Sequence, residues 1–250
     1  MRIFSSVWWY DVKSAKDLIN AKADAGEKAT VISPYFVAVD KGVPPMREIA
    51  AAAQKSNVEL TAYINLHSLG EQSPDAVPLK LAIVKELGVK NVAFAIPDDR
   101  DLEGTSVESR DLAKRLESDV VRAAADCADV GVNMWIILPV GVYKKYVKSA
   151  SGLLPTIRKL GIRLYIDARR LGYDFEKSDA FRLLTENGDL IAALAFVYED
   201  IETLREVLVR LPEDCSIIPG RDDRDNTPFE QVRIKVSEML GGTEGKEVLE

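Results

Sequence analysis

A chain of 250 residues is long for one ordinary domain, but a barrel of alternating strands and helices typically needs about this length. Its hydrophobic fraction of 47% is that of a globular protein, and no apolar run approaches the roughly 18 residues of a membrane helix. The formal charge of −7 argues against nucleic acid or an anionic membrane as the main partner, because both need a cationic surface.

The amino terminus and the cysteines indicate a cytoplasmic protein. Arg2 is the only basic flank before Asp11, and no helical apolar run intervenes, which is not the layout of a signal peptide. Cys127 and Cys215 form no CxxC pair and lack the spacing of a metal clip. We therefore expect two buried thiols and no disulfide.

An extended apolar run followed by an amphipathic helical run recurs about eight times along the chain. Near-continuous apolar or β-branched runs are typical of parallel strands that are buried on both faces. The predicted strands end at Tyr10, Phe36, Leu66, Ile96, Leu138, Asp167, Val197 and Ile218.

The predicted helices between these strands begin and end at capping residues. Ser73 and Pro74 supply an N-cap and a proline at the first helical position, and Gly88 ends the same helix. The longest helix is expected from about Ser106 to Ala128, before Gly131. Glycine accepts the left-handed conformation that closes a helix, and we expect the same use of Gly26, Gly161 and Gly188.

Eight strand-helix units are compatible with an open doubly wound sheet as well as with a closed barrel. An open nucleotide-binding sheet usually has a glycine-rich first turn, and the sequence contains neither GxGxxG nor GxxxxGK[ST]. We therefore predict an α/β protein with a single parallel (β/α)8 TIM barrel over residues 1–240. Residues 241–250 are glycine-rich and charged, and we expect them to form a flexible tail.

The central part of the chain has a characteristic order of segments. Residues 58–99 contain a strand followed by His67, an acidic linker, a helix ending in LG and a further strand. GIRLYIDARR ends a strand on Asp167, and LIAALAFVYED follows as the next strand. This order resembles the xylose isomerase-like TIM barrels, which include sugar and sugar-phosphate isomerases and epimerases and the endonuclease IV fold. The resemblance implies a small polar substrate, such as a polyol, a sugar or a sugar acid.

The family's metal site is incomplete in this sequence. The resemblance implies a divalent metal held by Glu, Asp, His and Glu from strands five to eight. Only His67, Asp167 and Asp200 match by position, whereas strand five ends in IILPVG and strand eight reads SIIPGRDD. Bound Mg²⁺ or Mn²⁺ is therefore optional, and tight metal binding of the family kind is not expected. The weak candidate ligands are Asp167, Glu199, Asp200 and Asp222, although the acidic pairs to which the last three belong would equally suit helix N-termini.

Candidate site residues follow the predicted strands, because the loops of a barrel converge at the carboxyl ends. His67 is the only histidine, so imidazole proton transfer near neutral pH would use it; the alternative is a loop histidine bonded to backbone. Asp167 closes an apolar strand, where a carboxylate needs partners, and a structural ion pair with a nearby arginine is its alternative role. The predicted catalytic residues are His67 and Asp167, and the predicted substrate-binding residues are Trp8, Tyr10, Tyr35, Asp98, Arg100, Arg169, Arg170, Tyr198 and Arg221.

Two functions remain open from the sequence. One is an isomerase- or epimerase-like enzyme, and the other is a non-catalytic or regulatory barrel that binds a small ligand and has lost the metal site. A nuclease is disfavoured, since its metal cluster needs several histidines. We expect the carboxyl face to be functional and the opposite face, with turns such as KELGVKN and RKLGIR, to be structural. The sequence leaves open whether the chain forms a homo-oligomer.

Overall fold

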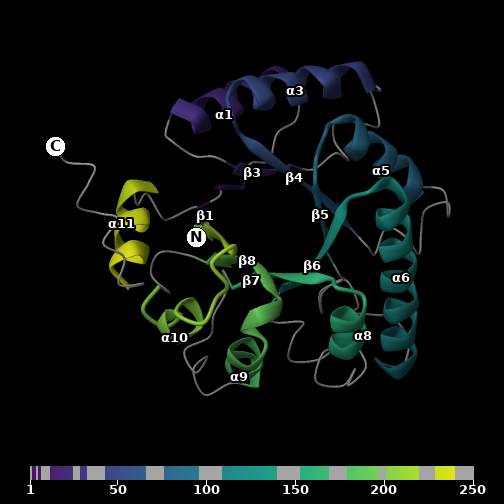
Figure 1. The fold of residues 1–250 in the computed structure, drawn as a ribbon, viewed down its shortest axis with the longest axis vertical. Helices are drawn as coiled ribbons and strands as arrows, with labels where there is room; N and C mark the ends of the chain where they lie inside the picture. The colour runs from purple at the N-terminus through teal and green to yellow at the C-terminus, as the bar shows by residue number, and fades with distance from the viewer. Residues whose placement is uncertain are drawn as a thin grey trace.

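Helices lie around the outside of the strands, and strand and helix alternate along the chain (Figure 1). The structure is a computed structural model that describes residues 2–3, 5–6, 12–24, 29–32, 43–65, 76–95, 109–139, 153–168, 179–196, 201–219 and 229–239. The strands are β1 (Arg2–Ile3), β2 (Ser5–Ser6), β3 (Ala29–Ile32), β4 (Glu59–Asn65), β5 (Asn91–Ala95), β6 (Asn133–Pro139), β7 (Arg163–Asp167), β8 (Ile191–Phe196) and β9 (Ser216–Pro219). The helices are α1 (Val12–Asp24), α3 (Val43–Lys55), α5 (Ala76–Glu86), α6 (Ser109–Val130), α8 (Leu153–Lys159), α9 (Asp179–Glu186), η3 (Gly188–Leu190, a 3-10 turn), α10 (Arg205–Leu208) and α11 (Phe229–Met239).

Two short segments at the amino terminus close the sheet. β1 pairs in parallel with β9, where Arg2 lies beside Ser216, and β2 pairs in parallel with β3, where Ser5 lies beside Thr30. The strand order is β1-β9-β8-β7-β6-β5-β4-β3-β2, so the segments at its two ends are parts of one stretch of chain. Counted as one strand, they complete a closed, eight-stranded parallel barrel. This confirms the predicted fold class; the described part of the predicted first strand consists of these two pairs of residues.

Four helix-to-strand turns share one geometry. Their left-handed residues are Asn57, Gly88, Gly131 and Gly161, with φ angles of 54°, 65°, 76° and 67°. The apolar residue that follows each of them is buried, and its N–H donates to a carbonyl five residues earlier, as from Val132 to Cys127 at 3.0 Å. This Schellman pattern ends the helix and directs the chain into the next strand. The predicted role of the three glycines is confirmed.

Gly188 differs from the prediction. It is buried in η3 and does not have a positive φ angle. A Cβ atom at this position would lie 3.1 Å from the Arg210 carbonyl oxygen. Helix α9 does end near Gly188, at Glu186, but the left-handed conformation predicted for the glycine is not adopted; instead, another backbone segment approaches it closely. The corresponding prediction for Gly26 lies outside the described residues.

Two hydrophobic layers stabilise the barrel. The larger layer joins outward-facing strand residues to the helices and includes Phe94, Ile136 and Ile166, all fully buried. The smaller layer contains strand residues alone and therefore fills the barrel interior. Its aromatic members come from β4, β6 and β7, whereas β5 and β8 contribute alanines, so that large and small side chains interdigitate. These interior residues are Tyr63, Ala93, Ala95, Trp135, Ile137, Tyr165, Ala192, Ala193 and Ala195.

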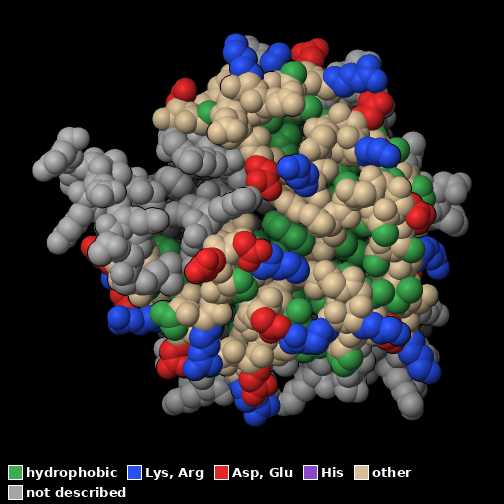
Figure 2. Space-filling model, viewed as in Figure 1, with side chains coloured by type: hydrophobic (Ala, Val, Ile, Leu, Met, Phe, Trp, Pro, Cys, Tyr) green, Lys and Arg blue, Asp and Glu red, His purple; other side chains and the backbone are tan. Residues whose placement is uncertain are grey.

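Charged side chains of both signs cover the outer surface. Basic and acidic side chains are interspersed on the face that Figure 2 shows, and no large single-sign patch is seen among its described residues. Several of them pair between neighbouring helices, as Lys16 does with Glu48 and Arg47 with Glu86, each at 3.2 Å. None of the described helices is long and apolar enough to cross a membrane.

Candidate functional site

Asp167 is the predicted site residue that falls within the described part of the chain. Its strand, β7, reads RLYID, and three apolar residues in its middle are buried. The remaining predicted catalytic, substrate-binding and metal-binding residues lie outside the described residues: His67, Trp8, Tyr10, Tyr35, Asp98, Arg100, Arg169, Arg170, Tyr198, Arg221, Glu199, Asp200 and Asp222.

The backbone holds Asp167 firmly at the carboxyl end of the barrel. Asp167 is aligned with Pro139 on β6 and with Ala195 on β8. The N–H of the next residue, Ala168, donates to the Ala195 carbonyl oxygen at 2.7 Å, which extends the ladder beyond the carboxylate. Because side chains alternate along a strand, Asp167 faces the same side as Tyr165, which is the barrel interior. The carboxylate is half-buried at the mouth of the barrel.

Apolar side chains of the interior layer lie near the same end of the barrel as Asp167. Ala195 is its neighbour on β8, and Ala95 ends β5 in the same interior layer. Ile137 lies on the adjacent strand two residues before Pro139. Alanine side chains are short, and the mouth of the barrel is where barrel enzymes bind their substrates.

The described strand ends do not provide the donors of a divalent-metal site. β5, β6, β8 and β9 end on Ala95, Pro139, Phe196 and Pro219, whose side chains cannot ligate a metal. A hard cation takes about six oxygen or nitrogen donors, whereas Asp167 offers one carboxylate. Within the described ranges, no three His, Cys, Asp or Glu side chains are grouped to hold a metal. The described residues therefore do not fit such a site by themselves.

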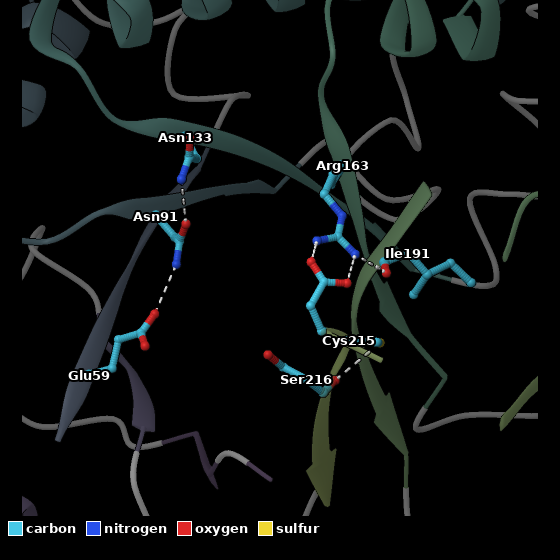
Figure 3. A network of polar contacts seen from close by, with 8 residues as sticks. Glu59, Asn91, Asn133, Arg163, Ile191, Cys215 and Ser216 are labelled. Atoms are coloured by element: carbon cyan, nitrogen blue, oxygen red, sulfur yellow. Dashed lines mark hydrogen bonds and ion pairs between the residues drawn. The ribbon is translucent and has the colours of Figure 1, made fainter. Parts of the chain in front are cut away.

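A second polar cluster lies at the opposite, amino-terminal end of the barrel (Figure 3). Asn91, which begins β5, donates from Nδ2 to Glu59 Oε1 on β4 at 3.1 Å. Asn133, which begins β6, donates from Nδ2 to Asn91 Oδ1, also at 3.1 Å. The three side chains thus form a hydrogen-bond relay across three adjacent strands.

Arg163 joins β7 to β8 and to the segment before β9 at the same end. Its Nη2 atom donates to Asp214 Oδ1 at 3.1 Å and to the Ile191 carbonyl oxygen at 2.8 Å, and Nη1 contacts the other carboxylate oxygen of Asp214. Asp214 precedes β9 and Ile191 begins β8, so one guanidinium connects β7, β8 and the segment before β9 (Figure 3). The arginine side chain is 29% exposed and Asp214 is 67% exposed.

A cleft of about 460 Å³ opens between the relay and the Arg163 pair. Glu59, Asn91, Asn133, Arg163 and Asp214 all line it. Its apolar wall comes from α6, the α8–β7 turn and β6, through residues such as Cys127, Leu160 and Trp135. Its volume is within the range of small-molecule sites, about 300–1,000 Å³.

The sequence interpretation missed this amino-terminal cluster, although a signal for it exists. In each case a polar residue begins the strand shortly after a left-handed turn residue, as in Gly131-Val132-Asn133 and Gly161-Ile162-Arg163. Because Val132 and Ile162 are buried against the helices, the next residue must face the barrel interior. A polar residue there is a departure from an apolar strand pattern.

Both cysteines are buried thiols, as predicted. Burial, together with the nearby Asp126 carboxylate, raises the pKa of Cys127 to about 12. Burial likewise raises the pKa of Cys215 to about 12, and the neighbouring Arg163 guanidinium opposes that rise. Thiols with such pKa values remain protonated at neutral pH and are poor nucleophiles.

No protein-family model matches the sequence, and no curated protein matches it either. The fold, by contrast, matches solved structures over nearly the whole chain. A D-psicose 3-epimerase structure determined with D-fructose has a TM-score of 0.71 and 14% identity, covering 97% of this chain and 100% of that one. An L-ribulose 3-epimerase has a TM-score of 0.70 and 12% identity, covering 96% and 94%. The fold is that of the xylose isomerase-like TIM barrels.

Two further matches are another sugar epimerase and a protein with a bound zinc atom. A 3-keto-D-glucoside 4-epimerase from E. coli has a TM-score of 0.66 and 12% identity, covering 96% of this chain and 99% of that one. The IOLI protein, whose structure holds a zinc atom, has a TM-score of 0.63 and 11% identity, covering 96% and 98%. At these identities the likeness concerns the fold, and the chemistry depends on the site residues.

Proposed function

We propose that this chain is a sugar or sugar-phosphate isomerase or epimerase that acts on a small polar substrate at the carboxyl face of the barrel. The observation that carries the proposal is the position of Asp167, a half-buried carboxylate at the end of β7 beside Ala195. The full-length structural matches to sugar epimerases support it. They do not decide it alone, because a Brucella melitensis AP endonuclease matches the same fold with a TM-score of 0.56, 11% identity, and coverage of 97% of this chain and 90% of that one.

The chemistry of epimerisation suits two groups on different sides of a substrate. Inverting a carbon next to a carbonyl requires removal of a proton from one face and its return to the other. Asp167 is the proposed base on β7, and His67, which follows β4, is the proposed second group. β5 and β6 separate β4 and β7 in the sheet, so the carboxyl ends of these two strands lie on different sides of the barrel.

The other predicted residues would bind the substrate. Aromatic side chains stack on sugar rings, guanidinium groups bind carboxylates and phosphates, and carboxylates or phenols accept and donate hydrogen bonds to hydroxyls. In this proposal the aromatic group is Trp8, Tyr10, Tyr35 and Tyr198, and the charged group is Asp98, Arg100, Arg169, Arg170 and Arg221.

A second candidate is a barrel that binds a sugar or sugar acid without converting it. The end of β6 favours it, because Pro139 aligns with Asp167 where the family resemblance implies a glutamate. No step of the proposed reaction is therefore routed through a metal. Metal analysis of protein purified without added metal would show directly whether one is retained.

The test is solvent-deuterium exchange. Ketopentoses, ketohexoses and their phosphates are incubated with the protein in D₂O, and NMR detects both new epimers and deuterium at the exchanging carbon. We expect exchange with at least one compound, and we expect Asp167→Asn to reduce its rate by at least about 100-fold, the typical contribution of a general base. Glu86→Gln is the matched control, since it removes one surface carboxylate that pairs with Arg47, far from the barrel mouth.

Each outcome distinguishes the candidates. Exchange that is lost in Asp167→Asn and kept in Glu86→Gln supports the enzyme. Saturable binding of a sugar without exchange supports the binding barrel and contradicts the enzyme. Exchange at an unchanged rate in Asp167→Asn would show that this carboxylate is not the base.

A further inference from the structure

The amino-terminal cleft has a defined hydrogen-bonding polarity. An ionised carboxylate only accepts hydrogen bonds, so Glu59 requires the amide NH₂ of Asn91 to face it. The carbonyl oxygen of Asn91 then faces Asn133, which must present its own NH₂. The Asn133 carbonyl oxygen is left pointing away from the relay, as Figure 3 shows. The charge of Glu59 thus determines that the exposed end of the relay is an acceptor.

The formal charge of the cleft also favours a hydrogen-bond donor. Among its described lining residues, Glu59 and Asp214 are acidic and Arg163 is basic, which gives a sum of −1. The two Nη atoms of Arg163 already contact Asp214, and Nη2 also donates to a main-chain carbonyl. An anionic ligand would therefore meet carboxylates and a guanidinium that is already paired.

The apolar wall suits a short hydrocarbon stem. Leu160 is 40% exposed and lines the cleft, so its side chain offers an apolar surface there. Cys127 adds a neutral wall, because its pKa of about 12 keeps the thiol protonated. Trp135 also lines the cleft, and an indole ring attracts a nearby cation.

The hydrogen bonds of the relay do not include every polar group at this end of the barrel. Thr61 lies two residues after Glu59, on the same face of β4, and is aligned with Asn91. It is fully buried, and within the described part of the chain its hydroxyl has no hydrogen-bond partner. The barrel interior behind the relay therefore contains a polar group that takes no part in the relay.

We propose that the amino-terminal cleft is a second binding site, for a small organic cation that carries an ammonium or guanidinium group on a short aliphatic stem. The cationic group donates to Asn133 Oδ1 beside the Glu59 charge, and the stem lies against Leu160 and Cys127. The site is independent of the reaction proposed for the carboxyl face, which lies at the other end of the strands.

Agmatine is the probe, since it carries a guanidinium and an ammonium on a four-carbon stem. It is titrated into the whole protein labelled with ¹⁵N, and the side-chain NH₂ signals of Asn91 and Asn133 are followed by NMR. We expect saturable shifts of these signals with half-saturation near ~1 mM, typical of a ligand of about nine heavy atoms. Inorganic phosphate at the same concentrations is expected to leave both signals unchanged.

Two variants and one control identify the origin of the shifts. Glu59→Gln removes the charge and lets the relay reverse, so it should raise the half-saturation concentration at least about ten-fold. Asn133→Ala removes the terminal acceptor at an exposed position, so it tests the same point by a second substitution. Glu86→Gln, which changes the net charge equally on the outside of α5, should have no effect.

Several results would overturn the proposal. These are an absence of saturable shifts up to about 20 mM agmatine, equal affinity in Asn133→Ala, or equal weakening by Glu86→Gln, which would indicate only long-range charge attraction. Agmatine shifts that disappear in Asp167→Asn would place the cation at the carboxyl face and would equally contradict a separate site. Sugar turnover without agmatine binding would contradict this proposal and leave the proposed function intact.

Discussion

Arg163 and Asp167 occupy the two ends of β7 and face the same side of the sheet, with Tyr165 between them. Four residue steps of extended chain separate the two positions by about 13 Å along the strand. The arginine is tied to Asp214 and to the Ile191 carbonyl oxygen, whereas the carboxylate lies at the barrel mouth beside Ala195. One strand therefore carries the proposed catalytic carboxylate at one end and part of the proposed cation site at the other.

Substituting Asp167 separates a site role from a structural role. We expect Asp167→Asn to lower the free energy of unfolding by less than about 1 kcal/mol, because the side chain is half-buried and the backbone around it is fixed by β6 and β8. Urea unfolding measures this change. A loss of about 3–5 kcal/mol would instead identify Asp167 as one member of a buried structural ion pair.

The left-handed turns make a paired prediction about stability. Gly131→Ala should destabilise the protein by about 1–2 kcal/mol, because φ is +76° there although a Cβ would meet no atom within 4 Å. Asn57 has the same turn conformation without being glycine, so Asn57→Gly should be neutral or slightly stabilising. Thermal unfolding of the two variants checks this. A destabilised Asn57→Gly would show that the asparagine side chain, and not the backbone conformation, matters at that turn.

The fold could be predicted from the sequence because its signals are local. Gly88, Gly131 and Gly161 mark the helix ends, and the apolar runs between them give the strands. The left-handed conformation predicted for Gly188 is wrong, and the carbonyl of Arg210 that approaches this glycine comes from a distant part of the chain. A glycine that ends a helix and one that accommodates another backbone segment look alike in a sequence.

The amino-terminal cluster depends on strand register, which the sequence does not give directly. Asn91 lies 32 residues from Glu59, and Asn133 lies 42 residues from Asn91. Their contacts follow only once β4, β5 and β6 are aligned side by side. The position of Asp167 could be predicted because a carboxylate at the end of an apolar strand is visible locally. Its role in a site, and the residues predicted to converge with it, stay predictions.

The buried thiols should make stability depend on alkaline pH. The pKa of each cysteine rises to about 12 on folding, from about 8.5 in an unfolded chain. Below the thiol pKa of the unfolded chain, both states keep their thiol protons and the free energy of unfolding does not depend on these thiols' titration. Between about pH 8.5 and 12 the unfolded chain releases protons that the folded chain keeps, so the free energy of unfolding falls. The expected slope is about −1.4 kcal/mol per pH unit for each thiol in this window.

Urea unfolding at several pH values between 8 and 11 measures that slope, and the Cys127→Ala, Cys215→Ala double variant is the control for lysine and tyrosine titration. In the native state at pH 8, neither thiol should react with Ellman's reagent within the time that an unfolded sample needs for complete reaction. Rapid modification of either thiol in the folded protein would contradict the assignment.

Thr61 tests whether a buried polar group of the barrel interior lacks a hydrogen-bond partner. Its side chain is fully buried on β4, and within the described residues its Oγ1 atom has no hydrogen-bond partner. Burying an unpaired hydroxyl costs about 1–3 kcal/mol, and valine has nearly the same shape without the polar atom. Thr61→Val should therefore raise the free energy of unfolding by about 0.5–1 kcal/mol, since only part of that cost is recovered when the surroundings are polar.

Thr61→Ser keeps the hydroxyl and removes the methyl group, so it should lower the same free energy by about 1 kcal/mol. Urea unfolding of both variants at pH 7 makes the comparison. A destabilised Thr61→Val would mean that the hydroxyl has a hydrogen-bond partner in solution. The simplest such partner would be a bound water next to Asn91.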